Sequence, residues 1–413
     1  MSKELEILLY GEPVATLTKD AHGQWALRFT PSYLQLDDRP VLGQKFEDAL
    51  HSPFRGKKGN LPPFFANLVP EGELRPILED TLAIVQGDDV ALLEVIGRDL
   101  PGAVEFRTIS AGEPERHAIE DDAVEPTAPR DHDSESMRFS LAGVQLKFSV
   151  ILANDKITLP AHGKLGDWLV KLDSRRFPRL SQNEHSIMAW ARHAGFDVPE
   201  CQILPSSALI GKLGDYAEPD TFVLAVRRYD RHEGQKIHQE DYAQAVNLYP
   251  VNKYDHVSYE QLTVLTEKFV GEGARDEVIR RLVFMIASGN GDAHLKNWSL
   301  IYPDRIHAQL SPLYDQVSTV AWPELDRNLA LNFAGTKDMS QLDRQRVERF
   351  AGRAQLDGET VLKFVDATLA QLANAWKSVT RSADWVMAPE HVDALRDHWQ
   401  RTPLLRDSPL AGL

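Results

Sequence analysis

The segment Asn290-Gly291-Asp292-Ala293-His294-Leu295-Lys296-Asn297 is a polar loop between two different hydrophobic patterns. Before it, residues 275–287 carry apolar side chains at helical spacing, so we expect a helix with one buried face that stops at the Ser-Gly-Asn-Gly sequence of 288–291. After it, residues 298–302 are typical of a strand, and Pro303-Asp304 indicates a turn before a returning strand over 305–310. A hairpin centred near residue 304 places Leu310 opposite Trp298 and brings Asp315 back beside the loop.

Three oxygen-bearing side chains are therefore expected to meet at this loop. Phosphoryl transfer from ATP needs oxygen ligands for Mg²⁺ and a carboxylate that accepts the proton of the attacking hydroxyl. In protein kinases the catalytic Asp precedes a metal-binding Asn by five residues, and a second metal-binding Asp follows beyond a hairpin. The same offset separates Asp292 from Asn297, and Asp315 stands at the later position. The pattern predicts Asp292 as the catalytic residue, with Asn297 and Asp315 holding Mg²⁺.

Two other interpretations of the loop stay open. Asn290, Asp292 and Asn297 are residue types that routinely serve as turn and cap residues. Alternatively, Asp292, His294 and Asp315 are ligands of a hydrolytic metal site, although further histidines at helpful spacing are missing. The ordered combination of helix, loop, hairpin and acid favours the kinase interpretation over both.

The nucleotide-binding side of a kinase has candidates earlier in the chain. Residues 140–147, Ser-Leu-Ala-Gly-Val-Gln-Leu-Lys, precede an apolar strand, and such a loop can turn its N–H groups toward phosphates or be a plain turn. Lys171 lies inside the apolar strand 168–172, where its charge needs a partner such as ATP phosphate unless it extends outward from an edge strand. Glu184 can pair with Lys171, but the Ser181–Glu184 sequence is also a capping box, which is the role we favour.

A strand over 221–227 leads toward the expected connection between two lobes, where a kinase holds adenine. The residues that follow it include Arg228, Asp230 and Arg231. These three side chains can equally form a structural ion network.

The chain as a whole has the composition of a globular protein of more than one domain. Its 413 residues are 43% hydrophobic and 26% charged, with a net charge of −15 and one cysteine. The acidic balance argues against autonomous nucleic-acid binding, and no basic segment with a long apolar run indicates a secretory signal or a membrane span. We expect a cytoplasmic protein with no membrane partner.

Composition and periodicity divide the chain into four parts. Residues 1–108 are expected to form an α+β unit with strands near 5–10 and 24–29 and a helix near 72–85, and 109–137 an acidic linker or loop. Residues 138–250 are expected to form a second α+β unit, with strands near 148–152, 168–172 and 221–227 and a helix over 183–194. Residues 251–413 are expected to be mainly helical, with helices near 259–270, 275–287, 342–353, 359–375 and 389–401.

Several motifs in one order resemble the HipA-like toxin kinases of bacterial type II toxin–antitoxin systems. They are Ile96–Ala103, Ser140–Lys147, Arg228–Arg231, His238–Asp241, Asn290–Asn297 and Pro312–Asp315. The resemblance implies a serine/threonine kinase of α+β class with a protein-kinase-like two-lobe architecture. In it, an α+β N-terminal lobe with two subdomains is followed by an all-helical C-terminal lobe.

The resemblance also implies the roles of individual residues. Asp292 is then catalytic, Asn297 and Asp315 bind Mg²⁺, and Ser140 is the site of a self-inactivating autophosphorylation, since a phosphate there would repel ATP or displace the loop. Arg227 replaces a Glu of many relatives, so only its backbone is expected to contact adenine, and Leu146 replaces a more polar residue or proline. The implied ATP contacts are Ala142, Gly143, Val144, Gln145, Leu146, Lys147, Lys171, Arg227, Arg228, Tyr229, His294, Leu295, Lys296, Asn297, Tyr314 and Asp315.

The partners that the resemblance implies are proteins. Relatives phosphorylate aminoacyl-tRNA synthetases, the glutamyl enzyme above all, which halts translation and favours dormancy. They are restrained by a small HipB-like helix-turn-helix antitoxin, through which they reach operator DNA. The alternative within the same family is a nucleotide-binding corepressor with little kinase activity.

Overall fold

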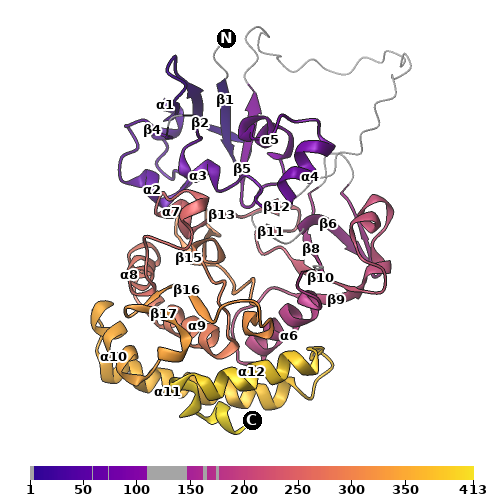
Figure 1. Ribbon diagram of the computed structural model, residues 1–413. Helices are drawn as coiled ribbons and strands as arrows, with labels where there is room; N and C mark the ends of the chain where they lie inside the picture. Colours follow the sequence, from indigo (N-terminus) through magenta and orange to yellow (C-terminus); the bar gives the residue numbers. More distant parts are fainter. Residues whose placement is uncertain (1–3, 58, 73, 109–146, 161–164, 174–175) are drawn as a thin grey trace.

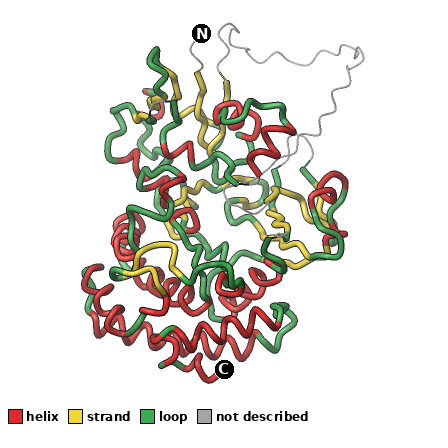
Figure 2. Tube along the Cα trace, in the orientation of Figure 1, coloured by secondary structure: helices red, strands yellow, loops and turns green. Residues whose placement is uncertain are grey.

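The computed structural model describes residues 4–57, 59–72, 74–108, 147–160, 165–173 and 176–413 (Figure 1). Two sheets occupy one part of the molecule, and most of the long helices gather in the other part (Figure 2). The predicted α+β class with two lobes is confirmed. The helical lobe also contains short strands, which an all-helical lobe would lack.

The first sheet is antiparallel throughout and has the strand order β4-β3-β2-β1-β5. Its strands are β1 (Glu4–Leu9), β2 (Glu12–Lys19), β3 (Trp25–Phe29), β4 (Phe54–Arg55) and β5 (Val104–Thr108). The connections carry α1 (Pro31–Leu34), α2 (Gln44–Glu47), α3 (Pro63–Ala66), α4 (Leu74–Thr81) and α5 (Asp89–Ile96). The predicted strands near 5–10 and 24–29 and the predicted helix near 72–85 correspond to β1, β3 and α4.

The second sheet carries a candidate site residue, Lys171, on its middle strand. Its order is β7-β6-β8-β10-β9, with antiparallel pairing around β8 and β10. The strands are β6 (Lys147–Ala153), β7 (Lys156–Thr158), β8 (Trp168–Leu172), β9 (Cys201–Pro205) and β10 (Phe222–Arg227), and α6 (Leu180–His193) crosses between β8 and β9. Both sheets contribute to one hydrophobic cluster, so their inner faces share a core.

The rest of the chain combines helices with three small sheets. The helices are α7 (Tyr242–Ala245), α8 (Tyr259–Val270), α9 (Ala274–Ser288), α10 (Arg344–Arg353), α11 (Gly358–Val379), α12 (Pro389–Arg401) and α13 (Pro403–Arg406). The strands are β11 (Arg231–His232), β12 (Gln235–Lys236), β13 (His238–Asp241), β14 (Ser299–Tyr302), β15 (Gln309–Leu310), β16 (Asn328–Phe333) and β17 (Thr336–Asp338). Every predicted helix beyond residue 251 is confirmed, and α8 and α12 have the predicted bounds.

A tryptophan cluster fixes α6 to the helical lobe. Trp190 of α6 lies 5.0 Å from Trp376 of α11 and 6.1 Å from Trp399 of α12, measured between ring centroids. All three rings are buried, and edge-to-face aromatic contacts of this kind add to the free energy gained from burial. Helix α6 therefore connects the second sheet with the helices of the C-terminal lobe.

The hairpin that follows the polar loop has a register different from the predicted one. Leu310 pairs with Leu300, and not with Trp298 as predicted. The cause is the turn, because the Asp304 carboxylate accepts hydrogen bonds from the backbone N–H of Ile306 at 3.0 Å and of His307 at 2.8 Å. This turn, in which an aspartate side chain bonds to backbone N–H groups, centres the hairpin on residue 305. The strand pairing therefore shifts by two residues. Because side chains alternate between the faces of a strand, each side chain stays on its predicted face of the sheet.

Glu240 of β13 is a buried acid between helix α2 and strand β14 of the three-stranded sheet β13-β14-β15. Its side chain is fully buried, and Oε1 accepts hydrogen bonds from the backbone N–H of Gln44 at 2.8 Å and from the Tyr302 hydroxyl at 2.5 Å. Burial raises the pKa of Glu240 to about 8. The folded protein therefore holds a proton there at neutral pH.

Stability is expected to depend on pH through this group. Between the unfolded pKa of about 4.3 and the folded value, only the folded state binds the proton, so the free energy of unfolding falls by about 1.4 kcal/mol per pH unit as pH rises. Glu240→Gln should remove this slope, measured by urea unfolding at pH 5.5, 6.5 and 7.5. Other acids titrate in both proteins and cancel in the difference. Parallel curves for the native chain and the variant would contradict the assignment.

Candidate active site

The polar loop between α9 and β14 is held by its own backbone and by the core. Helix α9 ends at Gly289, which has a φ of 64°, a conformation that glycine adopts without steric cost. The buried Asn290 side chain accepts a hydrogen bond from the Asp292 N–H at 2.9 Å and donates one to Gln316 at 3.1 Å. Asn290 thus serves as a turn residue, as one of the two other interpretations of the loop proposed.

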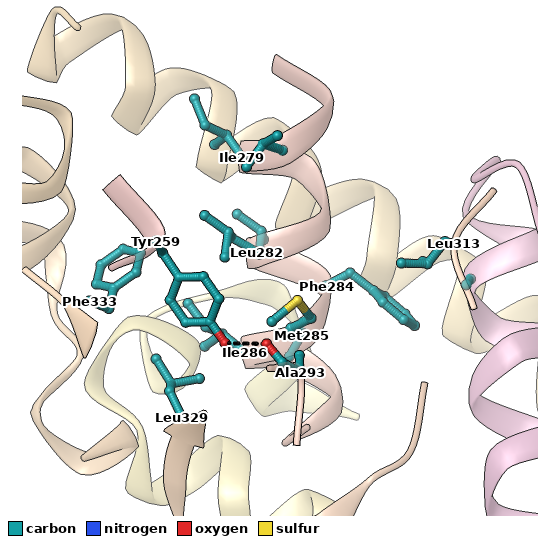
Figure 3. Packing of buried hydrophobic residues seen from close by; sticks show 14 of the residues in the cluster. Tyr259, Ile279, Leu282, Phe284, Met285, Ile286, Ala293, Leu313, Leu329 and Phe333 are labelled. Carbon is teal, nitrogen blue, oxygen red and sulfur yellow. Dashed lines mark hydrogen bonds between the residues drawn. The ribbon is translucent and has the colours of Figure 1, made fainter. Parts of the chain in front are cut away.

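A second anchor of the loop comes from α8. The Tyr259 hydroxyl donates to the Ala293 carbonyl at 3.1 Å, and both residues lie in the hydrophobic cluster of the helical lobe (Figure 3). In the same view, Leu282, Met285 and Ile286 of α9 pack around this contact. Helix α9 and Tyr259 therefore hold the backbone of the loop against the core of the helical lobe.

Asp292 is exposed, and a tyrosine from a neighbouring loop contacts its carboxylate. The Tyr254 hydroxyl donates to Oδ1 of Asp292 at 2.7 Å, while the Asn297 amide donates to the Asp292 carbonyl at 2.8 Å. The Tyr254 ring also meets the His294 ring edge-on at 5.0 Å. Burial and the Asp292 charge raise the pKa of Tyr254, so its hydroxyl remains protonated.

Asp315 is paired with two lysines from the middle of the second sheet. Its carboxylate contacts the ammonium group of Lys147 at 2.9 Å and also that of Lys171. Burial alone would raise the pKa of Asp315, but the two lysine charges outweigh it and hold the pKa well below its usual range. The φ of Asp315 is 53°, a left-handed conformation that is uncommon outside glycine. This anionic carboxylate is therefore fixed in place.

The two lysines are cross-strand neighbours. Lys147 opens β6 and pairs directly with Lys171 of β8, so their side chains leave the same face of the sheet. Lys171 is 3% exposed on a central strand, so the alternative that it extends from an edge strand is wrong. Burial opposes its charge, yet Asp315 and Glu184 raise the pKa of Lys171 above its usual value.

Glu184 pairs with Lys171 and does not cap its helix. The favoured capping role is wrong because α6 begins at Leu180, which puts Glu184 in the second turn of the helix. The helix start is satisfied instead by Asp173, whose carboxylate accepts hydrogen bonds from the N–H of Arg179 and of Ser181, each at 3.0 Å. A buried Glu184 is then free to hold the Lys171 ammonium group.

Two cavities meet at Lys147 and Asp315. One, of about 130 Å³, is lined among others by Lys171, Arg227, Tyr229, Lys296 and Tyr314. The other, of about 440 Å³, is lined among others by Tyr254, Asp292, His294 and Asn297. The predicted catalytic and metal-binding residues thus face one cavity, and most residues predicted to contact the nucleoside face the other.

Aromatic rings and a buried ion network form one end of the smaller cavity. Tyr229 and Tyr314 lie 5.5 Å apart at an interplanar angle of 38°. The Arg228 guanidinium is turned away into contacts with Asp99 and Asp230, which is the structural network given as the alternative for this residue. The exposed Arg227 side chain contacts Glu200 at 3.4 Å. Both arginine side chains therefore make ion pairs within the protein.

The loop residues after His294 are bound to the first subdomain. The Lys296 ammonium group donates to the Asn67 carbonyl at 3.0 Å and pairs with Glu71, which also pairs with Lys253 at 3.2 Å. His294 is buried, and burial lowers its pKa to about 4, so the imidazole is neutral. Leu295 is fully buried in the core of the helical lobe. Residues 1–108 therefore help to position the polar loop.

Sequence reasoning missed two contributors to this site. Tyr254 and Glu71 belong to no motif, and each reaches the loop from a distant segment. The exposed aromatic at Tyr254, between Lys253 and Asp255, was the available signal. Ser140, Ala142, Gly143, Val144, Gln145 and Leu146 lie outside the described residues.

The metal-hydrolase interpretation is not supported by the geometry. Among the described residues, no three His, Cys, Asp or Glu side chains are grouped so that they could hold a metal ion, and Asp292, His294 and Asp315 are all described. The two residues predicted to bind Mg²⁺ fit that role by their position and by the charge of Asp315. Asn297 and Asp315 line the same cavity, and the anionic Asp315 offers the oxygen donors that Mg²⁺ prefers.

Comparisons with known proteins agree along the whole chain. A model of the HipA-like C-terminal domain matches residues 139–376, and a model of the HipA N-terminal domain matches residues 5–107. The protein named "Putative kinase Y4dM" from Sinorhizobium fredii is 38% identical over 98% of each chain. The "Serine/threonine-protein kinase toxin HipA" of Shewanella oneidensis is 27% identical over 67% of each chain.

A solved structure shares the fold. It is the complex of Shewanella oneidensis HipA, HipB and operator DNA, with a TM-score of 0.74 at 21% identity over 98% of this chain and 97% of that one. Among the described residues, no helix combines the length and the apolar character needed to cross a membrane. With both domain models matched in order, this chain belongs to the HipA-like family.

Proposed function

We propose that this protein is a serine/threonine kinase that transfers the γ-phosphate of ATP to a protein hydroxyl. The observation that carries the proposal is the meeting of Asp292, Asn297 and Asp315 at one cavity, next to the Lys171–Glu184 pair. Kinases require an ion pair of this kind and a metal-binding Asp beside it. The names of the relatives support the same activity.

Each residue has a role that follows from its surroundings. Asp292 accepts the proton of the attacking hydroxyl, because its carboxylate is exposed in the larger cavity and already receives a hydroxyl hydrogen bond. Lys147, where the two cavities meet, and Lys171, in the smaller cavity, hold the nucleotide phosphates. Asn297 and Asp315 would hold the metal. Bound Mg²⁺ supplies charge neutralisation for the transferred phosphoryl group. Tyr229 and Tyr314 offer aromatic faces for the adenine.

The finer parts of the proposal rest on the family. We assign autophosphorylation to Ser140, a HipB-like antitoxin as the partner that leads to operator DNA, and an aminoacyl-tRNA synthetase as the first substrate to test. The solved HipA–HipB–DNA complex supports the antitoxin assignment. We also propose a cytoplasmic location, and a division into 1–108, an acidic segment 109–137, a nucleotide-binding part 138–250 and a catalytic lobe 251–413.

The direct test is labelling with radioactive ATP. Native protein incubated with Mg²⁺ and γ-labelled ATP should incorporate phosphate at Ser140, identified by mass spectrometry, and should label a member of a synthetase panel. Chelation of the metal with EDTA should abolish both signals. Binding of Mg-ATP without labelling of the protein or of the panel would replace the kinase with the corepressor alternative.

The Tyr254 hydroxyl is expected to position Asp292 for this reaction. Among the described residues, the Tyr254 hydroxyl is the one group that donates a hydrogen bond to the Asp292 carboxylate. One hydrogen bond to a charged group contributes about 1.5 kcal/mol. Tyr254→Phe should therefore lower kcat by about tenfold with little change in KM for ATP. Steady-state kinetics measure both values.

The matched control for this variant is Tyr249→Phe. Its hydroxyl contacts the backbone of Lys57 and Leu61 and lies away from Asp292, so activity should be retained. An increase of kcat in Tyr254→Phe would instead show that the tyrosine hydroxyl blocks the place of the substrate.

A further inference from the structure

The larger cavity has a second kind of lining that phosphoryl transfer does not explain. Beside its polar residues it is lined by five apolar side chains, one of which is Val317. The other four, which we call the apolar wall, are Phe177, Leu180, Trp322 and Leu325. Phosphate groups and Mg²⁺ are strongly hydrated and gain nothing from apolar surroundings. The wall therefore points to an occupant other than the nucleotide.

The apolar wall is built from two segments far apart in the sequence. The rings of Phe177 and Trp322 meet edge-to-face at 5.6 Å, and Trp322 is backed by the His391 ring of α12 at 4.9 Å. His391 is in turn contacted by the Asn183 amide at 3.3 Å. Trp322 is thus held in place, while Phe177, Leu180 and Leu325 are only half-buried and can still bury surface against a ligand.

Trp322 also carries a buried polar atom that is unpaired within the described part of the chain. Its side chain is 5% exposed, and no described residue accepts a hydrogen bond from the indole Nε1. Buried indole N–H groups usually find an acceptor, since leaving one unpaired costs free energy.

We propose that the apolar wall is a specificity subsite for the protein substrate. It takes a large apolar side chain next to the serine or threonine that is phosphorylated. This inference rests on the proposed kinase function, because the wall shares its cavity with Asp292 and Asn297. The nucleoside has its own cavity, beyond Lys147 and Asp315.

The test compares peptides that differ only beside the acceptor. Serine peptides with Leu or Phe at each flanking position in turn are incubated with the native chain and Mg-ATP, alongside the same peptides with Gly or Asp there. Burial of one large apolar side chain predicts that kcat/KM at one flanking position is about 10- to 100-fold higher for Leu or Phe.

A charge placed in the wall should reverse this preference. Leu325→Asp adds a carboxylate at a half-buried loop position, so the advantage of Leu should disappear and Lys or Arg should become favoured at the same position. The matched control is Leu36→Asp, because Leu36 is 53% exposed and lies outside both cavities. That control should keep the native preference.

Binding separates the subsite from the chemistry. The Asp292→Asn chain with Mg²⁺ and a non-hydrolysable ATP analogue should bind the fluorescent Leu peptide more tightly than the Gly peptide, measured by anisotropy. Equal kcat/KM for all peptides would overturn the subsite and leave the kinase standing. Transfer to no peptide, together with no labelling of Ser140 or of the synthetase panel, would overturn the kinase and the subsite with it. Equal anisotropy for the Leu and Gly peptides would overturn the subsite alone.

Discussion

Asp292→Asn is expected to reduce phosphate transfer by about 10²- to 10⁴-fold, which is the usual contribution of a general base. The amide keeps the shape of the side chain and can still contact the Tyr254 hydroxyl, but it cannot take up the proton of the substrate hydroxyl. Affinity for Mg-ATP should change little, because the proposed phosphate and metal contacts come from Lys147, Lys171, Asn297 and Asp315. Labelling rates and nucleotide binding by calorimetry measure the two effects separately.

The control for this variant is Asp326→Asn. Asp326 is also an exposed acid that lines the larger cavity, and its carboxylate accepts a hydrogen bond from the Asn328 N–H at 3.0 Å. The same change of charge in the same cavity should leave the rate near that of the native chain. Equal losses in both variants would mean that the cavity needs negative charge in general and that Asp292 has no special role.

Local patterns in the sequence were sufficient to predict most helices and strands and to locate the three central polar residues of the site. Strand β8 and helix α12 have the predicted bounds because β8 is a short, mostly apolar run and α12 has apolar residues at helical spacing. Asp292, Asn297 and Asp315 were found from spacing, and the structure brings Asn297 and Asp315 to the cavity of Asp292. Their catalytic and metal-binding roles stay predictions.

Pairings between distant segments could not be read from local patterns. The Ser181–Glu184 sequence matches a capping box, but the helix starts at Leu180 because Asp173 satisfies its first N–H groups. Glu184 then meets Lys171 through the tertiary fold. Likewise, the hairpin register depends on the hydrogen bonds that Asp304 makes within its turn, and a count of residues does not contain them.

The buried arginine network shows a further limit of the sequence. Arg228, Asp230 and Arg231 are adjacent in the chain, and a structural network was one of two interpretations. What decides between the two is Asp99, which comes from the first subdomain and contacts both arginines at 3.0 Å. The network therefore couples residues 1–108 to the segment that lines the smaller cavity.

The second large effect is expected from removing the centre of this network. Asp230 accepts hydrogen bonds from Arg228 at 2.8 and 2.9 Å, from Arg231 at 2.9 Å and from the Gly102 N–H at 2.8 Å. Burial opposes its charge, but the two arginines hold the pKa of Asp230 well below its usual range. Asp230→Ala leaves two buried guanidinium groups with Asp99 as their remaining carboxylate.

Breaking a buried pair on one side costs about 3–5 kcal/mol, so Asp230→Ala should lower the free energy of unfolding by that amount in urea. If it does not fold, Asp230→Asn keeps most hydrogen bonds and should lose less. The control is Glu200→Ala, which removes the exposed pair with Arg227, the residue before Arg228, and should cost about 0–1 kcal/mol. Equal losses in the buried and the exposed variants would contradict a structural network, because only burial makes an unpaired guanidinium costly. A loss of Mg-ATP affinity in Asp230→Asn, with stability kept, would assign Arg228 to the nucleotide instead.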